Sequence, residues 1–256
     1  MNINEKVAII TGGASGLGWA TAELLHSKGA KIAIFDMNDD LGKERAEALG
    51  NGAVYFNVNV AEEESVQTGL NGVKNTFDEV HICCNYAGIG TPSRTVGKDG
   101  PMPLDWFKRV IDVNLVGTFN VIRLTASMMA KNEPVTDDGC RGVIINTASV
   151  AAFEGQIGQA AYSASKGGVV GMTLPIARDL ASIGIRVNTI APGLINTPML
   201  QGLPEPAKSS LANTVLFPRR LGEPQEIANV AEMLIENDYM NGETIRMDGG
   251  IRMQPK

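Results

Sequence analysis

A tyrosine and a lysine at helical spacing are the residues of this sequence best suited to acid–base chemistry. Tyr162 and Lys166 lie four positions apart, so they share one face if the segment is helical. A tyrosine with a pKa near about 10 needs a fall of roughly 3 pH units to act as a base near neutrality. One ammonium about 4 Å away supplies roughly that much, although burial opposes the fall because it disfavours the phenolate. With Ser149 upstream to bind a carbonyl or alcohol oxygen, the set predicts interconversion of an alcohol and a ketone.

Taken alone, these residues also fit a plain structural interpretation. Tyr162 then is a half-buried helix residue, Lys166 is solvated, and Ser149 merely starts a turn. The elements around them decide between the two interpretations.

A glycine-rich turn near the amino terminus predicts a site for a pyrophosphate. The turn contains Gly12, Gly16 and Gly18 and lies between a strand expected at 6–11 and a helix expected at 17–28. The first two glycines suit backbone angles that other residues avoid, and the third lets the helix approach the strand. The first-turn amides and the helix dipole then face the pyrophosphate. An oxidised nicotinamide ring on such a dinucleotide is the second positive charge that an acidic tyrosine needs.

The next strand, expected at 31–36, ends in Asp36. A carboxylate there accepts hydrogen bonds from an adenosine ribose and repels a 2′-phosphate. Positions 14, 15, 37 and 38 carry no basic residue that would hold such a phosphate. The sequence therefore favours NAD over NADP. The alternative interpretation is that Asp36 is an ordinary turn residue at the end of a strand.

Length and composition predict one domain that covers residues 1–256. The chain is 44% hydrophobic and 20% charged, with no run of about 18 apolar residues that would span a membrane. A net charge of −6 argues against broad binding to nucleic acid or anionic membranes. Three cysteines and two histidines offer no disulfide framework and no metal site, which favours a reducing compartment. No signal or transit peptide is apparent, and we expect a cytoplasmic protein, or a mitochondrial matrix protein if the source is eukaryotic.

Strands and helices are expected to alternate along the chain. The expected strands lie at 6–11, 31–36, 53–58, 80–85, 142–148, 185–190 and 243–248. The expected helices lie at 17–28, 40–49, 62–77, 104–131, 160–182, 205–215 and 224–236, with a local kink at Pro175. Because parallel neighbours need crossover connections, this order predicts an α/β fold: a Rossmann-type doubly wound parallel sheet of about seven strands with helices on both faces.

Together these motifs resemble the short-chain dehydrogenase/reductase family. The resemblance runs from about residue 5 to residue 250 and is carried by Thr11 to Gly18, Asn85-Tyr86-Ala87-Gly88, Asn114, Ser149, Tyr162, Lys166, and Pro192-Gly193 with Thr197. Within the family, residues 142–166 and 171–189 are most similar to the type II 3-hydroxyacyl-CoA dehydrogenases, also described as 17β-hydroxysteroid dehydrogenase type 10. The segment between Gly88 and Trp106 and the polar stretch 132–141 are similar to that subgroup too.

The resemblance assigns roles by position. It implies the catalytic residues Asn114, Ser149, Tyr162 and Lys166, with Asn114 holding a water that links Lys166 to solvent. It implies NAD contacts from Gly12, Ser15, Gly16, Leu17, Gly18, Asp36, Asn59, Val60, Asn85, Ala87, Gly88, Tyr162, Lys166, Pro192, Gly193 and Thr197. Gln156 and Gln159 are expected to contact the substrate, and a substrate lid is expected at about 196–217. The family also implies a homotetramer, assembled through the helices near 104–131 and 160–182 and the carboxyl-terminal strand and tail.

Two positions depart from the family pattern. Tyr86 stands where the family usually has asparagine, and its bulk near the cofactor is expected to alter packing or loop motion. Asn59 stands where an aspartate commonly binds adenine. Its amide oxygen still accepts from an adenine amino group, so we expect binding to persist.

The resemblance implies an NAD-dependent oxidoreductase that interconverts short or branched (S)-3-hydroxyacyl-CoA and 3-oxoacyl-CoA, with hydroxysteroids as secondary substrates. The polar segment 91–103, with Arg94 and Lys98, is either a site for the coenzyme A phosphates or a solvated loop. One alternative is a 3-oxoacyl-[acyl carrier protein] reductase or another short-chain alcohol dehydrogenase, although such reductases commonly prefer NADPH, which Asp36 opposes. The other is a nucleotide-binding scaffold without catalysis, which an intact serine, tyrosine and lysine oppose.

Overall fold

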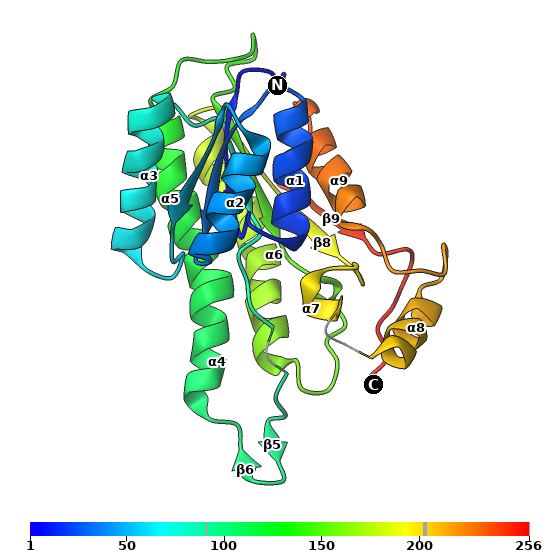
Figure 1. Cartoon of the computed structure of the whole chain (residues 1–256). Helices are drawn as coiled ribbons and strands as arrows, with labels where there is room; N and C mark the ends of the chain where they lie inside the picture. Colours follow the sequence, from blue (N-terminus) through cyan, green and yellow to red (C-terminus); the bar gives the residue numbers. More distant parts are fainter. Residues whose placement is uncertain (91, 202–203, 256) are drawn as a thin grey trace.

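Seven parallel strands form the central sheet in a computed structural model of the chain, which describes residues 1–90, 92–201 and 204–255 (Figure 1). The strands are β1 (Val7–Thr11), β2 (Lys31–Asp36), β3 (Ala53–Asn57), β4 (Ile82–Asn85), β7 (Gly142–Thr147), β8 (Ile185–Pro192) and β9 (Thr244–Met247). Their order across the sheet is β3-β2-β1-β4-β7-β8-β9. The chain order therefore reverses between β1 and β4, the place where ligands bind in open sheets of this kind. The predicted doubly wound fold is confirmed.

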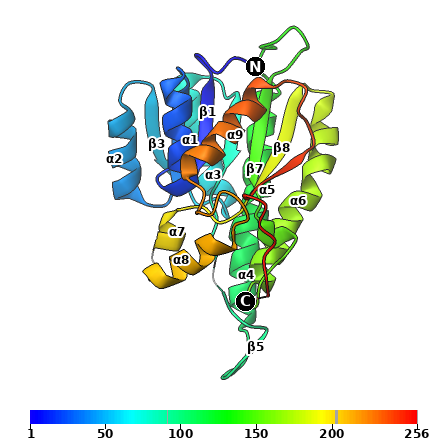
Figure 2. The ribbon, with the colours of Figure 1, turned by 90° about the vertical axis from the view of Figure 1, so that its right-hand side faces the viewer.

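Helices cover both faces of the sheet (Figures 1 and 2). The described helices are α1 (Gly16–Ser27), α2 (Asp39–Leu49), α3 (Glu63–Phe77), α4 (Leu104–Ile111), α5 (Gly117–Met129), α6 (Ala160–Ala181), α7 (Pro198–Gln201), α8 (Glu205–Thr214) and α9 (Pro224–Glu236). Of these, α1, α2 and α9 cover one face of the sheet and α3, α5 and α6 cover the other. Alternate residues of a strand point to opposite faces. Ile10 thus packs in a core with α1, α2 and α9, whereas Ile9 packs in a second core with α3, α5 and α6.

The long helix predicted at 104–131 is wrong in one respect. Between α4 and α5 lies a π turn, Asp112–Val116, in which the Gly117 N–H bonds to the Asp112 carbonyl five residues back. The apolar pattern runs through this turn without a break, so the extra residue leaves no mark in the hydrophobic periodicity. The helix α6, in contrast, continues through Pro175 to Ala181.

The segments around the expected substrate side contain a hairpin and a short helix, α7, that the sequence did not predict, whereas α8 confirms the helix expected at 205–215. A short hairpin, β5 (Val96–Gly97) with β6 (Gly100–Pro101), projects beyond α4 at the end of the molecule where α7 and α8 lie (Figure 1). The expected lid at 196–217 contains α7 and α8, and its residues Gly202 and Leu203 lie outside the described part of the chain, as do Thr91 and Lys256.

The three cysteines are free thiols buried in the protein interior. Cys83 and Cys84 belong to β4, the strand at the middle of the sheet, and both have 0% exposure. Over the described ranges, no helix is both long and apolar enough to cross a membrane. The same ranges hold no cluster of histidine, cysteine and carboxylate side chains suited to a metal ion.

Candidate active site

The turn between β1 and α1 has the shape that a pyrophosphate needs. Gly12 and Gly16 adopt φ of +62° and +55°, the left-handed region that favours glycine. A Cβ on Gly18 would overlap the carbonyl oxygen of Gly12, so this helix can approach the strand only with glycine there. Ser15 at the start of α1 makes no side-chain capping bond, which leaves the amides of the first turn free to bind an anion. The predicted cradle therefore fits a dinucleotide.

Asp36 at the end of β2 is held in a fixed orientation beside this cradle. Its Oδ2 accepts from the Ala14 N–H at 3.1 Å and its Oδ1 from the Asn38 N–H at 3.0 Å. Each carboxylate oxygen keeps a further lone pair for another donor. The geometry suits the ribose hydroxyls that the sequence analysis assigned to this carboxylate.

Arg45 is a basic neighbour of the cradle that the sequence analysis missed. It lies on α2, its Nε donates to the Ala14 carbonyl at 3.3 Å, and its guanidinium carbon stands 4.5 Å from the centre of the Trp19 ring. No local pattern connects an arginine on the second helix with an alanine in the first turn. Only the packing of α2 against α1 brings them together.

Asn59 and Val60 lie at the start of the segment that leads into α3. The Asn59 side chain closes this turn, because Oδ1 accepts from the Ala61 N–H at 3.1 Å and Nδ2 donates to Glu62 at 2.7 Å. The buried Val60 accepts from Asn120 through its carbonyl at 3.0 Å. One lone pair of the Asn59 oxygen remains for the predicted adenine contact, which stays a prediction.

Tyr86 directs its bulk into the core. Its hydroxyl lies 2.8 Å from the Thr21 hydroxyl on α1, and its ring packs in the core on that face of the sheet. Burial raises the pKa of Tyr86 well above its usual value. Of its two neighbours, Ala87 approaches the cradle, since its N–H bonds to the Thr11 hydroxyl at 3.2 Å, whereas Asn85 donates to Asn146 on β7 at 2.9 Å.

Ser149, Tyr162 and Lys166 meet at the carboxyl ends of the strands. Ser149 follows β7 and caps a short helical turn by accepting from the Ala151 N–H at 3.1 Å. The Ser149 side chain also interacts with Tyr162 on α6, and this interaction acts to lower the pKa of the phenol. Lys166, one turn further along α6, is only 5% exposed, so the solvated alternative is wrong. Its Nζ donates to the Thr147 carbonyl at 2.7 Å and stands 5.7 Å from the centre of the Tyr162 ring.

The charges of this trio are poorly solvated. Burial lowers the pKa of Lys166 to about 8. Burial also raises the pKa of Tyr162, and the hydrogen bond from Ser149 only partly opposes that rise. The acidic tyrosine that the sequence predicted is therefore not produced by the lysine alone. It requires a further positive charge at the site, which the sequence analysis assigned to the nicotinamide ring.

Asn114 lies in the π turn and is fully buried, so it is not a solvated surface residue. Its Oδ1 accepts from the Ile89 N–H at 2.8 Å, while Nδ2 donates to the Ile89 carbonyl at 2.9 Å and to Ser165 at 3.1 Å. A Cβ on Gly88 would stand 3.2 Å from this Oδ1 and 3.7 Å from the Lys166 ammonium. The side chain thus joins the loop after β4 to α6, close to Lys166.

The remaining cofactor residues of the sequence analysis lie at the end of β8 and beyond it. Pro192 ends the strand, and the Gly193 N–H bonds to the Met247 carbonyl at 2.9 Å. A Cβ on Gly16 would lie 3.7 Å from the Thr197 side chain. The start of the predicted lid therefore reaches the glycine turn.

Gln156 and Gln159 lie on the loop between Ser149 and Tyr162. The Gln156 amide donates to the Gln254 carbonyl at 2.9 Å. The Gln159 side chain accepts from the Gln156 N–H at 2.9 Å. Both amides are thus bound within the protein, and their contact with substrate stays a prediction.

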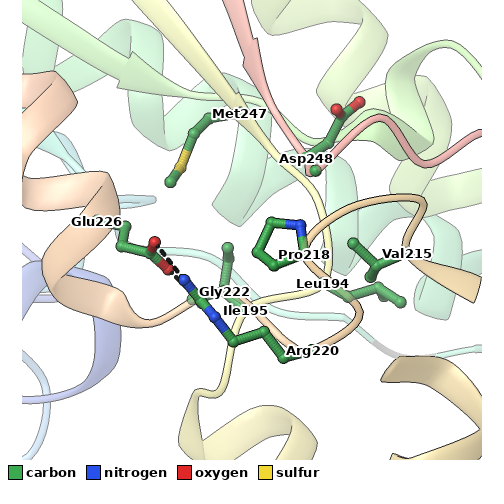
Figure 3. Close-up of a pocket in the computed structure, with 10 residues that line it drawn as sticks. Leu194, Ile195, Val215, Pro218, Arg220, Gly222, Glu226, Met247 and Asp248 are labelled. Atoms are coloured by element: carbon green, nitrogen blue, oxygen red, sulfur yellow. Dashed lines mark hydrogen bonds and ion pairs between the residues drawn. The ribbon is translucent and has the colours of Figure 1, made fainter. Parts of the chain in front are cut away.

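A small cavity of about 80 Å³ lies behind the end of the predicted lid (Figure 3). Val215 and Pro218 border it on the lid side and Met247 borders it from β9. The ion pair between Arg220 and Glu226, 2.7 Å long, closes one side. The residues of the trio do not line this cavity, so it is separate from their site.

Comparison with known proteins relates this chain to one enzyme family. A family model described as "Enoyl-(Acyl carrier protein) reductase" matches residues 12–252. The human protein named "3-hydroxyacyl-CoA dehydrogenase type-2" is 58% identical over 256 residues, which cover 99% of this chain and 98% of that protein. This chain belongs to the short-chain dehydrogenase/reductase family. The Drosophila melanogaster relative with the same name is 53% identical to this short-chain dehydrogenase and covers 99% of it, with 100% of the relative covered.

A solved structure extends the likeness to three dimensions. The "Crystal structure of 3-hydroxyacyl-CoA dehydrogenase type-2 from Mycobacterium avium" superimposes with a TM-score of 0.94 at 42% identity, and covers 100% of this chain and 98% of that one. As an oxidoreductase of this family, the short-chain dehydrogenase uses a nicotinamide cofactor and a small-molecule substrate. The sequence analysis assigned these two ligands to the cradle, Asp36 and the trio of Ser149, Tyr162 and Lys166, and that assignment stays a prediction.

Proposed function

We propose that this short-chain dehydrogenase interconverts (S)-3-hydroxyacyl-CoA and 3-oxoacyl-CoA of short or branched chain, with NAD as cofactor and hydroxysteroids as secondary substrates. The observation that carries the proposal is the convergence of Ser149, Tyr162 and buried Lys166 at the sheet edge, beside a cradle for a dinucleotide. The substrate class rests on the relatives named 3-hydroxyacyl-CoA dehydrogenase type-2, which match nearly the whole chain.

The preference for NAD rests on Asp36. Its carboxylate is fixed by two backbone N–H groups and keeps lone pairs for ribose hydroxyls, whereas a 2′-phosphate in their place would meet a like charge. Arg45 tempers this argument, since it is a cation near the same turn. However, its Nε is bonded to the Ala14 carbonyl and its guanidinium is stacked on Trp19, so it is engaged within the protein.

The bound cofactor supplies the hydride acceptor and a positive ring charge. In the proposed mechanism, Ser149 orients the substrate oxygen through its hydroxyl, and Tyr162 accepts the proton of the alcohol at its phenolic oxygen. Lys166 stabilises the phenolate and passes on the proton through its ammonium, which the Thr147 carbonyl keeps in place. Asn114 keeps the Ile89 peptide beside Lys166, where it would hold the water that connects the lysine with solvent.

Further parts of the proposal concern the whole enzyme. We place the substrate lid at 196–217, since its start lies against the glycine turn. A homotetramer would cover the half-exposed side chains of Trp106, Val116 and Phe119 on the α4–α5 arm, and a mass measurement in solution tests it. The expected location is the cytoplasm, or the mitochondrial matrix in a eukaryote.

The test follows absorbance at 340 nm with acetoacetyl-CoA, offering NADH and NADPH separately to the purified protein. We expect loss of NADH absorbance, a much slower reaction with NADPH, and almost no turnover by Tyr162→Phe, which should still bind NADH. A preference for NADPH, together with faster reduction of acyl carrier protein thioesters, would instead identify a carrier-protein reductase. Binding of NADH without turnover across a panel of ketones and alcohols would identify a non-catalytic scaffold.

A further inference from the structure

The loop between Ser149 and Tyr162 is bound to the carboxyl-terminal end of the chain. We call residues 153–159 the substrate loop and residues 248–255 the tail. The Gln156 amide donates to the Gln254 carbonyl at 2.9 Å, and the Ile157 N–H bonds to the Pro255 carbonyl at 3.1 Å. These contacts join parts of the chain about one hundred residues apart.

A cluster of charges reinforces this connection. Arg246, at the end of β9, donates through both terminal nitrogens to the two carboxylate oxygens of Glu154, at 2.7 and 2.9 Å. The same guanidinium bonds to Asp248 at 2.8 Å and to the Ile251 carbonyl at 3.1 Å. Such two-pronged, charge-assisted bonds are strong and fix the relative orientation of their partners.

Partial burial protects this ion pair from solvent. The side chains of Arg246 and Glu154 are only 21% and 25% exposed. The Arg246 guanidinium also stands 5.1 Å from the centre of the Phe153 ring, which covers one side of it. The arginine lowers the pKa of Glu154, so this carboxylate stays charged near neutral pH.

The substrate loop transmits the position of Glu154 to the trio. The Glu154 N–H bonds to the Val150 carbonyl at 3.0 Å, directly after Ser149. Gly155 lies against Ser163, the neighbour of Tyr162, so closely that a Cβ on the glycine would overlap the serine hydroxyl. A shift of Glu154 therefore displaces the backbone next to both Ser149 and Tyr162.

We propose that Arg246 and Glu154 are positioning residues that hold the substrate loop against the tail and so set the place of the acyl substrate at the trio. This inference rests on the proposed function for the identity of the substrate. The pyrophosphate cradle and Asp36 lie on β1, α1 and β2, and no contact described for them reaches the substrate loop or the tail. Gly193, near the expected nicotinamide end, does pack against the tail, since a Cβ on Gly193 would overlap the backbone of Asp248. The pair therefore acts mainly on the substrate half of the reaction, while the part of the site assigned to the adenosine and pyrophosphate of the cofactor stands apart from it.

The experiment compares Glu154→Gln, Arg246→Gln and the exchanged pair Glu154→Arg with Arg246→Glu. Steady-state rates with acetoacetyl-CoA and NADH give KM and kcat, and fluorescence titration gives the Kd for NADH. Glu63→Gln is the matched control. Glu63 on α3 forms an ion pair with Arg123 on α5 at 2.9 Å, and neither helix carries the substrate loop or the tail. We expect each single change to raise KM about five- to tenfold and to lower kcat, with the Kd for NADH within about twofold.

The exchanged pair should recover only part of the lost kcat/KM, since opposite charges face each other again but the carboxylate at position 246 then lies beside Asp248. Unchanged kinetics in both single variants would overturn the inference, as would an equal weakening of NADH binding, which indicates general damage to the fold. Amide hydrogen exchange supplies a reading that needs no turnover. Glu154→Gln should speed amide exchange in residues 150–163 but not in residues 12–36. Equal protection of residues 150–163 in the two single variants and in the unchanged protein would refute the role of the Arg246–Glu154 pair, even if acetoacetyl-CoA proves not to be a substrate.

Discussion

Replacement of Lys166 by methionine should stabilise the ligand-free protein at neutral pH while it abolishes turnover. Burial lowers the pKa of this lysine from the ordinary 10.5 to about 8. At about 1.4 kcal/mol for each pH unit, keeping the ammonium charged at pH 7 costs the folded state about 3 kcal/mol relative to the unfolded chain. The variant also leaves the Thr147 carbonyl without its 2.7 Å donor, which costs about 1 to 2 kcal/mol. The expected net gain at pH 7 is about 1 to 2 kcal/mol.

The sign of the pH dependence separates this explanation from a simple packing effect. Because the folded pKa lies below the unfolded one, the unfolded chain binds more protons between about pH 8 and 10.5. The unchanged protein therefore gains stability from Lys166 as the pH rises through this window, and Lys166→Met does not. The free energy of unfolding of the variant, minus that of the unchanged protein, should fall by about 3 kcal/mol between pH 7 and pH 10.5.

Urea unfolding at a fixed protein concentration, at pH 7, 8, 9 and 10, measures this difference without requiring activity. Lys74→Met is the control, because Lys74 is exposed on α3 and its replacement makes the same chemical change at the protein surface. A pH-independent difference for Lys166→Met would refute the argument that the buried ammonium destabilises the fold. Full turnover of this variant at 340 nm would refute the role proposed for the lysine.

Three further changes test other parts of the site. Tyr86→Phe removes one of the two hydrogen bonds of the Thr21 hydroxyl, which keeps the Leu17 carbonyl as its acceptor, and should lower the free energy of unfolding by about 1 kcal/mol. NADH affinity should stay within about twofold, and a large loss of affinity would place the phenol in the cofactor site instead. Asn114→Leu leaves the N–H and the carbonyl of Ile89 without their side-chain partner. Thermal unfolding should therefore show a free energy of unfolding lower by at least about 2 kcal/mol, and turnover should nearly vanish. Unchanged stability would contradict the hydrogen-bond argument. Asp36→Ser should raise the Kd for NADH about tenfold and lower the Kd for NADPH, as measured by fluorescence titration. If the ratio of the two constants is the same in the variant as in the unchanged protein, Asp36 does not determine the cofactor preference.

The sequence predicted the sheet and much of the site because their determinants are local. A β-branched strand, a glycine turn and an amphipathic helix follow one another directly, and the resulting fold is as expected. The four-residue spacing of Tyr162 and Lys166 likewise placed both on α6. Burial could not be judged from that spacing, and so the direction of the tyrosine pKa in the ligand-free protein was not predictable.

Most of the features that the sequence did not predict depend on contacts between distant segments. Arg45 reaches the glycine turn only because α2 packs beside α1. Glu154 and Arg246 are ninety-two positions apart, and two ordinary surface-type residues give no sign that they will pair. The π turn Asp112–Val116 is local, but one extra residue in an apolar helix leaves the hydrophobic pattern intact.

Cys83 reports how often the protein core opens, because its side chain packs in the core between the central sheet and the helices α3, α5 and α6. Only a thiolate attacks a labelling reagent, and burial raises the pKa of this thiol to about 12 while it shields the sulfur fully from solvent. Modification therefore has to wait until this core opens. In the presence of a fast thiol reagent, the rate of Cys83 modification measures how often these rare openings occur. Ligands that bind across the strand ends should lower this rate as their occupancy rises.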